Sequence, residues 1–355
     1  MSDKLNSDAR TDLYTGFDCL MWASHIRFEL LGLMYFCGGV VRILVGDIGG
    51  TNSRFAVYDG SSISRLELYL NKDVDQIDDL VEDLVRRNPD VAGVSIGIAG
   101  PVQDQTVRML NFDWTLCGDA LSHRLDKPVL LLNDFHAQAY AVPHLSPQSW
   151  IPLDEIPQPE RRNIAVIGAG TGLGEAMCIW TGNEWFPVAG EGSHVRFGPK
   201  DERQIQVLIK LLERWPDHVS VERIVSGPGI VNVYDVLRGE AAIHPSVEES
   251  DNRAAAISKL ALEKGCPIAI ETIDMFVDVL ADEAASLALK CAAGSVYISG
   301  GIPPKILPIV KARFRDAFHR KGRYRNYMQG VPIRIVTEPY LGLIGAGIAA
   351  RRQRT

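Results

Sequence analysis

Two kinds of hydrophobic pattern alternate along the chain from residue 41 onward. Short apolar, β-branched runs predict strands at 41–46, 54–58, 65–70, 92–99 and 129–132. Between the third and fourth runs, apolar residues recur at helical spacing from Val74 to Val85, and the pattern stops at Asn88-Pro89. Strands that alternate with amphipathic helices are typical of α/β proteins. We therefore expect an α/β fold that opens with a βββαβ unit.

A second unit is predicted after the proline-rich segment 143–159, which we interpret as the domain boundary. Strands are expected at 163–167, 175–180, 185–188, 295–299 and 331–336. Helices are expected at 204–215, 222–225, 253–264 and 271–292. The chain thus divides into a small α/β domain at 41–145 and a large α/β domain at 146–339.

The first 40 residues differ from the rest of the chain. Their apolar run, 30–41, has twelve residues and follows Arg27 and Glu29. A helix that crosses a bilayer needs about 20 apolar residues, so we predict no membrane span. Acidic residues near the start and the lack of a cleavage site disfavour export. Residues 1–40 are either an appended helix or the product of a start assigned too early, with Met34 near the real one.

Composition excludes several classes of protein. The 37 Lys and Arg residues against 44 Asp and Glu give a net charge of −7, which disfavours binding to nucleic acid or to an anionic membrane. The six cysteines form no CxxC pair and have no metal-ligand spacing. We expect reduced thiols in a cytoplasmic protein without a zinc site.

Three glycine-rich clusters follow predicted strands, at 47–52, 168–174 and 299–301. Such turns either cradle phosphate with backbone N–H groups or simply close a hairpin. Asp47 precedes the first cluster, and a carboxylate beside bound phosphates can hold Mg²⁺ through water. The GxxxxGK[ST] motif of P-loop proteins is absent. A GxGxxA match at 345–350 lacks a following βαβ unit, so we interpret its glycines as allowing close helix packing.

Polar residues at two further places suggest chemistry. Asp134 follows the apolar strand 129–132 and is either a general base or the N-cap of a helix. Glu191 and His194 lie in a glycine-flanked segment, and Glu222 follows later. Carboxylates and an imidazole suit the adjacent hydroxyls of a sugar. For His194 a structural role and zinc ligation are the alternatives, and the cysteines offer no zinc partners.

Six motifs in order carry a resemblance to a known family. They are LVGDIGGTNSRFAV, NDF, GAGTGLG, GEGSHV, ERIVSGPG and SGGIPPK, spread over 41–350. The chain resembles the bacterial glucokinases of the hexokinase and actin-like ATPase superfamily. This resemblance implies a two-domain actin-like ATPase (ribonuclease H-like) fold with a cleft between the domains, and a small domain that residues 340–355 complete. It also implies ATP:D-glucose 6-phosphotransferase activity.

The resemblance also assigns roles to single residues. Asp134 is expected to be the catalytic base. The expected sugar ligands are Asn133, Glu191, His194 and Glu222. The expected nucleotide ligands are Gly49, Gly50, Thr51, Asn52, Gly170 and Thr171 at the phosphates and Gly300 and Gly301 near the adenosine. Asp47 is expected to help place Mg²⁺. The family further suggests a homodimer.

The chain departs from related patterns in three ways. It lacks the cysteine-rich zinc motif of the repressor, open-reading-frame and kinase family, so it resembles the zinc-free branch. Arg196 stands where some members carry an acid, and residues 1–40 have no counterpart. Two alternatives stay open: a kinase for another hexose or an amino sugar, and a non-catalytic sugar-responsive binding protein.

Overall fold

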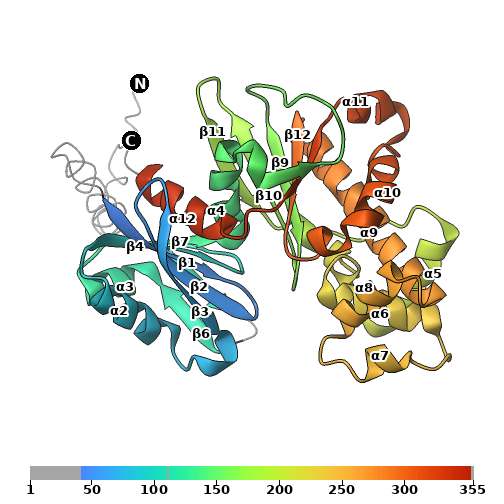
Figure 1. The fold of residues 1–355 in the computed structure, drawn as a ribbon, viewed down its shortest axis with the longest axis horizontal. Helices are drawn as coiled ribbons and strands as arrows, with labels where there is room; N and C mark the ends of the chain where they lie inside the picture. The colour runs from blue at the N-terminus through green and yellow to red at the C-terminus, as the bar shows by residue number, and fades with distance from the viewer. Residues whose placement is uncertain (1–40, 110–111, 353–355) are drawn as a thin grey trace, which may run out of the picture.

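The computed structural model describes residues 41–109 and 112–352. The predictions for residues 1–40 lie outside this range. Two mixed β-sheets form the framework, and helices cover both of them (Figure 1). No helix of the described part is long and apolar enough to cross a membrane.

The first sheet has the strand order β3-β2-β1-β4-β7. Its strands are β1 (Arg42–Ile48), β2 (Asn52–Tyr58), β3 (Ile63–Leu70), β4 (Val91–Ile98) and β7 (Val129–Asn133). Strands β1, β4 and β7 run parallel, whereas β2 and β3 are antiparallel additions at one edge. The predicted βββαβ unit is confirmed.

Alternate residues of this sheet face two separate cores. One face packs against α2 (Ile77–Arg87), α3 (Gly118–Leu125) and the hairpin of β5 (Thr106–Met109) and β6 (Trp114–Cys117). The other face packs against α4 (Asp134–Ala141) and α12 (Leu341–Arg352). The β5–β6 hairpin was not predicted, because four-residue strands are too short to give a periodic signal.

The second sheet has the strand order β11-β10-β9-β12-β13-β8. Its strands are β8 (Trp150–Pro152), β9 (Ile164–Ala169), β10 (Leu173–Trp180), β11 (Trp185–Gly190), β12 (Ser295–Ser299) and β13 (Ile333–Val336). Strand β8 falls inside 143–159 and pairs antiparallel with β13. The proline-rich segment is therefore not only a linker, because its middle adds an edge strand to this sheet.

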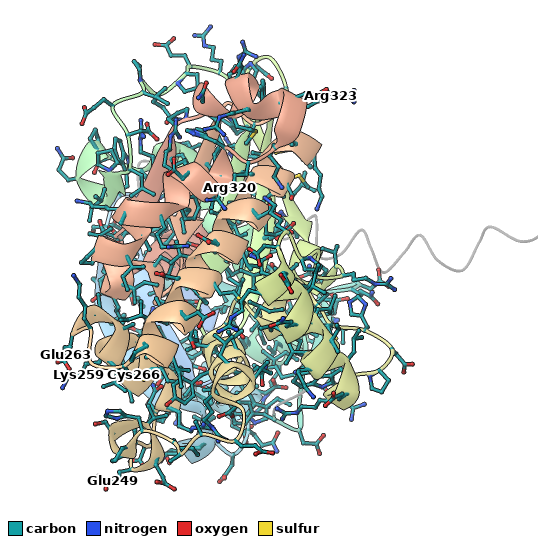
Figure 2. All side chains as sticks on the ribbon, turned by 90° about the vertical axis from the view of Figure 1, so that its right-hand side faces the viewer. Glu249, Lys259, Glu263, Cys266, Arg320 and Arg323 are labelled. Carbon is teal, nitrogen blue, oxygen red and sulfur yellow. The ribbon has the colours of Figure 1, made fainter. Side chains whose placement is uncertain are left out.

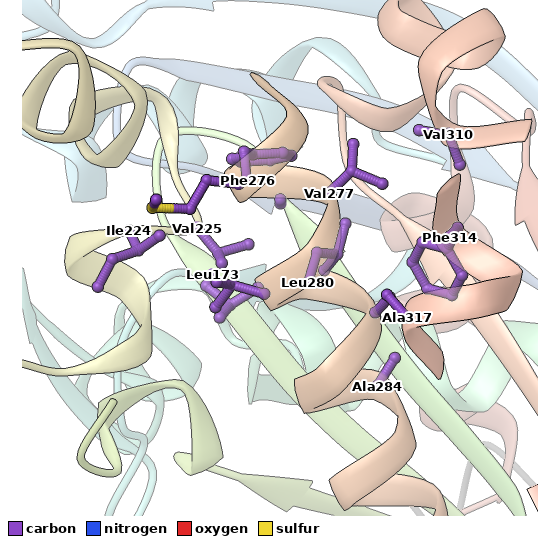
Figure 3. Packing of buried hydrophobic residues seen from close by; sticks show 14 of the residues in the cluster. Leu173, Ile224, Val225, Phe276, Val277, Leu280, Ala284, Val310, Phe314 and Ala317 are labelled. Carbon is purple, nitrogen blue, oxygen red and sulfur yellow. The ribbon is translucent and has the colours of Figure 1, made fainter. Parts of the chain in front are cut away.

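A layer of helices covers the second sheet. It contains α5 (Glu202–Arg214), α6 (Gly227–Arg238), α7 (Pro245–Glu248), α8 (Arg253–Leu262), α9 (Pro267–Lys290), α10 (Leu307–Phe318) and α11 (Arg325–Gln329). The long helix α9 is central, and its Val277, Leu280 and Ala284 lie in one buried cluster with Phe314 of α10 (Figure 3). Charged side chains cover the outer surface, where Lys259 of α8 and Glu263 at its C-terminal end form a 3.8 Å ion pair one turn apart (Figure 2).

The helix predicted at 222–225 is wrong. The structure has a single 3₁₀ turn, η5 (Val221–Arg223), and α6 begins five residues further on. Ser226 caps α6 by accepting a hydrogen bond from the backbone N–H of Gly229, and a proline lies in the first turn. Ser-Gly-Pro is a helix start, because proline at the first turn loses no hydrogen bond. Helix α10 was also missed.

Helix α4 lies between the two sheets and joins their cores (Figure 1). Its Ala137 packs with the first sheet and α12, whereas Ala139 and Ala141 pack with strands β9 and β10 of the second sheet. On that side, the thiol of buried Cys178 donates to the carbonyl oxygen of Ala139 over 3.2 Å. Small side chains let α4 approach both sheets closely.

Glycine on α12 permits the same close approach. A Cβ added to Gly345 would lie 1.7 Å from the carbonyl oxygen of Ala137, and one added to Gly347 would lie 2.2 Å from the Tyr58 ring. The interpretation of the 345–350 glycines as packing positions is confirmed.

We predict that Gly345→Ala destabilises the protein, because a backbone carbonyl of α4 cannot yield to the new methyl group. The expected loss is about 1–3 kcal/mol, the usual cost of overpacking a close interface. Chemical denaturation measures it. Gly198→Ala is the control, since no atom lies within 4 Å of a Cβ at that position. Equal stability of the two variants would contradict the packing argument.

Candidate active site

A cavity of about 460 Å³ opens between the two sheets. Turns from both sheets line it, and it brings together ten of the residues singled out from the sequence: Gly49, Gly50, Asn133, Asp134, Gly170, Thr171, Glu191, His194, Glu222 and Gly300. Four others, Asp47, Thr51, Asn52 and Gly301, are not part of its lining. The polar positions of six separate sequence motifs thus meet in one place.

The first glycine-rich turn joins β1 to β2. The N–H of Gly49 donates to the carbonyl oxygen of Asn52 over 3.0 Å. Fully buried Asn71 holds the turn from outside, because its side-chain amide donates to the Gly49 carbonyl and its carbonyl accepts from the Ser53 hydroxyl. Sequence analysis missed Asn71, since a single asparagine after a strand carries no distinguishing pattern.

The second glycine-rich turn joins β9 to β10 and contacts the start of α6. The N–H of Gly227 donates to the carbonyl oxygen of Gly170 over 2.8 Å. Glu222 accepts a 3.0 Å hydrogen bond from the N–H of Leu173. A Cβ on Gly172 would lie 2.7 Å from the same carboxylate oxygen. Glu222 is therefore fixed by the glycine turn that it faces.

The third turn follows β12 and runs against the second. Gly300 has φ +87°, and a Cβ there would lie 2.3 Å from the carbonyl oxygen of Ala169. Only glycine combines this dihedral angle with so close an approach. The neighbouring Ser299 hydroxyl donates to the side-chain oxygen of Gln138 on α4 over 2.7 Å. This bond connects the third turn to the helix that begins at Asp134.

Asp134 is the first residue of α4. The side chain of Asn133 caps the helix by accepting from the N–H groups of Phe135 and His136, over 2.9 and 3.0 Å. The interpretation of Asp134 itself as the N-cap is therefore wrong. Because Asn133 takes the cap position, the Asp134 carboxylate faces the cavity.

The surroundings of Asp134 disfavour its charged form. Burial first, and then the charges of Asp47 and Glu191, raise the pKa of this carboxyl to about 7, against backbone hydrogen bonds that lower it. Burial also raises the pKa of Asp47 despite Arg54, whose guanidinium lies 3.7 Å away. Burial is thus the main cause of the raised pKa at both of these neighbouring acids.

Glu191 precedes the short turn η4 (Gly192–His194), and His194 ends it. Their side chains are 51% and 57% exposed, with 3.8 Å between Oε2 and Nε2. His194 is thus not a buried structural histidine. The backbone carbonyl of His194 contacts the Nε2 atom of His218 over 2.8 Å, which links the turn to the end of α5.

Several residues in the lining were not found from the sequence. Phe135 fits against β10, where a Cβ on Gly174 would lie 1.9 Å from its ring. Arg108 from β5, Gln138 from α4 and Glu175 from β10 complete the polar lining. Arg108 is the one Lys or Arg in the lining found within the described ranges. Over the same ranges, no group of three or more His, Cys, Asp or Glu is arranged to hold a metal ion.

Comparison with known proteins identifies a family. The model of the family described as Glucokinase matches residues 44–353. A glucokinase from Caulobacter vibrioides is 37% identical over 318 residues, which cover 86% of this chain and 94% of the relative.

Solved structures agree with this match. The crystal structure of glucokinase from an Antarctic psychrotroph has a TM-score of 0.75 at 30% identity, and the match covers 88% of this chain and 99% of that one. A ROK family glucokinase from Streptomyces griseus, in complex with glucose and AMPPNP, has a TM-score of 0.63 at 22% identity over 88% of this chain and all of that chain (100%). The second likeness shows the fold alone. The predicted actin-like ATPase fold class is confirmed.

We predict that Asp134→Asn raises the melting temperature at neutral and alkaline pH. The pKa of Asp134 is about 7 in the folded protein and near 3.8 when exposed, so ionisation costs stability progressively from about pH 4 to pH 7. The variant cannot ionise, and its advantage should grow over that interval and then stay constant. Thermal unfolding from pH 4 to 9 measures it, with Asp217→Asn at an exposed position as the control. A difference in melting temperature between Asp134→Asn and the unmodified protein that does not depend on pH would contradict the raised pKa of Asp134.

Proposed function

Since the chain belongs to the glucokinase family, we propose that it transfers the γ-phosphoryl group of ATP to the 6-hydroxyl of D-glucose, with Asp134 as the general base. One observation carries this proposal: the Asp134 carboxyl lies in a cavity between glycine-rich turns and a Glu-His-Glu set, with a pKa raised to about 7.

The base must take a proton from the sugar hydroxyl as the phosphoryl group arrives. A carboxylate with an ordinary pKa is a weak base at neutral pH, whereas one with a pKa near 7 is well matched to the task. Burial and the neighbouring acids supply that match for Asp134. Attachment to the first turn of α4 supplies its position. The phosphates themselves need positioning and charge stabilisation more than covalent chemistry.

We assign the sugar to Asn133, Glu191, His194 and Glu222. Carboxylates accept hydrogen bonds from adjacent hydroxyls, and the imidazole and the amide can donate. Glu222 is held by the second glycine turn, so a sugar bound there would lie beside the phosphate-binding backbone. The glucokinase from Streptomyces griseus, which shares the fold, was crystallised with glucose, and this supports a sugar as the ligand of the cavity.

We assign the nucleotide to the three glycine-rich turns: Gly49, Gly50, Thr51 and Asn52, then Gly170 and Thr171, then Gly300 and Gly301. AMPPNP, an analogue of ATP, in the same relative supports ATP as donor. Asp47 suits Mg²⁺, because burial disfavours its charge and a cation would relieve that cost. Mg²⁺ would neutralise the phosphate charge, and Asp47 would hold it through water.

The two separate sheets support a division of the chain into two domains. We propose a small domain at 41–145, completed by α12, and a large domain at 146–339, with α4 at their junction. We further propose a homodimer in the cytoplasm, on the strength of the family.

We predict that Asp134→Asn lowers turnover by roughly 10² to 10⁴, the usual contribution of a positioned base, and leaves D-glucose binding largely intact. A coupled assay of glucose 6-phosphate formation measures turnover, and calorimetry measures binding. Mannose and N-acetylglucosamine, run in parallel, test the alternative hexoses. Unchanged turnover would remove Asp134 from this role, and sugar binding without turnover in the unmodified protein would favour a binding protein.

We predict that Glu191→Gln weakens D-glucose binding by roughly tenfold or more, because a hydrogen bond to a charged acceptor is lost. Glu213→Gln on α5 is a matched control, since that side chain is 63% exposed and does not line the cavity. Calorimetry that finds equal affinity in the two variants would disprove the assignment of Glu191.

A further inference from the structure

Glu175 is a buried acid that the proposed reaction does not use. It lies on β10 just after the second glycine-rich turn, and it lines the cavity while only 2% exposed. Its side chain is on the same face of the strand as Leu173 and Met177. Leu173 lies in the buried cluster that contains Leu280 of α9 (Figure 3), and Met177 packs against that cluster. Glu175 therefore points from the sheet toward the helical core.

Its carboxyl group supports the segment that carries Glu191 and His194. A Cβ built on Gly192 would lie 1.9 Å from Glu175 Oε2, so the carboxyl packs directly against the backbone of that turn. Glu175 is also paired with Gly190 in the β10–β11 ladder. Backbone and side chain of one residue thus contact both ends of the segment 190–192.

The site does not favour a charge on Glu175. Its Oε1 atom is buried without a hydrogen-bond partner in the described part of the chain. Lys290, the cation whose charge lowers the pKa of Glu175, is 3.2 Å from Glu283 and so is already engaged. Burial first, and then the charge of Glu283, raises the pKa of Glu175 to about 8. An unpaired buried carboxylate is costly, whereas a neutral acid is tolerated.

The charged and titratable groups on the surrounding elements carry both signs. Strands β9 and β11 carry none. The others are Glu283, Asp282 and Lys290 from α9, His194 from η4 with Glu191 just before it, Glu222 and Arg223 from η5, and Asp134 and His136 from α4. Lys200 and Lys321 pair with Asp282. Of these groups, Glu283 raises the pKa of Glu175 and Lys290 lowers it.

We propose that Glu175 is a positioning residue which, as a neutral carboxylic acid, holds the 190–194 segment in place for sugar binding and releases it on ionisation. Above about pH 8 a negative charge would press against the Gly192 backbone and repel Glu191. Sugar affinity should then fall, while the chemistry at Asp134 is unaffected. The inference rests on the proposed function for the identity of the ligand, D-glucose, and for the assignment of Glu191 and His194 to the sugar.

The test is calorimetric titration of the full chain with D-glucose, without ATP, from pH 6.5 to 9.5. If only the neutral form binds, affinity should fall by up to about 30-fold between pH 7 and 9.5 in the unmodified protein. Glu175→Gln mimics the neutral acid and should keep its pH 7 affinity across the range, within about twofold. Asp134 titrates in both proteins, so their difference isolates Glu175. At saturating sugar, the two proteins should have the same dependence of kcat on pH.

A second variant keeps the test independent of how well Glu175→Gln folds. Glu283→Gln removes the repelling charge, which lowers the pKa of Glu175 and should move the loss of affinity to lower pH. Parallel pH profiles in the unmodified protein and Glu175→Gln, or an unmoved midpoint in Glu283→Gln, would overturn the inference. Failure of the unmodified protein to bind D-glucose at any pH would instead refute the proposed function.

Discussion

The close packing of α4 between the two sheets is the constraint on which the site depends. Glycines from three elements make this packing possible: Gly345 of α12, Gly97 of β4 and Gly174 of β10 each leave no room for a Cβ beside α4. Because the helix cannot shift toward either sheet, its first residue is fixed relative to the turns of both. The position of Asp134 is thus a result of backbone packing rather than of contacts to its own side chain.

Burial governs the electrostatics of the same region. Asp134 and Glu175 both lie where water is scarce and cations are few, and both have raised pKa values of about 7 and 8. Asp134 lines the cavity at the start of α4, whereas the carboxyl of Glu175 packs against the backbone of Gly192. Similar desolvation raises both pKa values, but we expect the two carboxyls to act differently, because one faces the cavity and the other faces the backbone of Gly192. The carboxyl groups of this lining can accept hydrogen bonds from the hydroxyl groups of a ligand. A cation bound with that ligand would offset their negative charge.

The sequence predicted the strands and the glycine-rich turns well, because local hydrophobic period and backbone freedom decide them. It misplaced α6, where glycine and proline after Ser226 start a helix instead of ending one. It could not reveal Asn71, Arg108 or Glu175, whose importance arises from neighbours distant in the chain. The cap on α4 shows the same limit, since Asn133 and Asp134 are equally good candidates until the backbone geometry is known.

Cys178 can report on the packing of α4 against the second sheet. Its sulfur is fully buried and bonded to the Ala139 carbonyl of α4, so a thiol reagent can reach it only when the helix separates from the second sheet. The rate at which a thiol reagent labels Cys178 therefore measures how often α4 separates from the second sheet. Burial also raises the pKa of the Cys178 thiol, so it stays protonated and unreactive until that opening occurs. The reactivity of the Cys178 sulfur toward thiol reagents therefore depends on the separation of α4 from the second sheet.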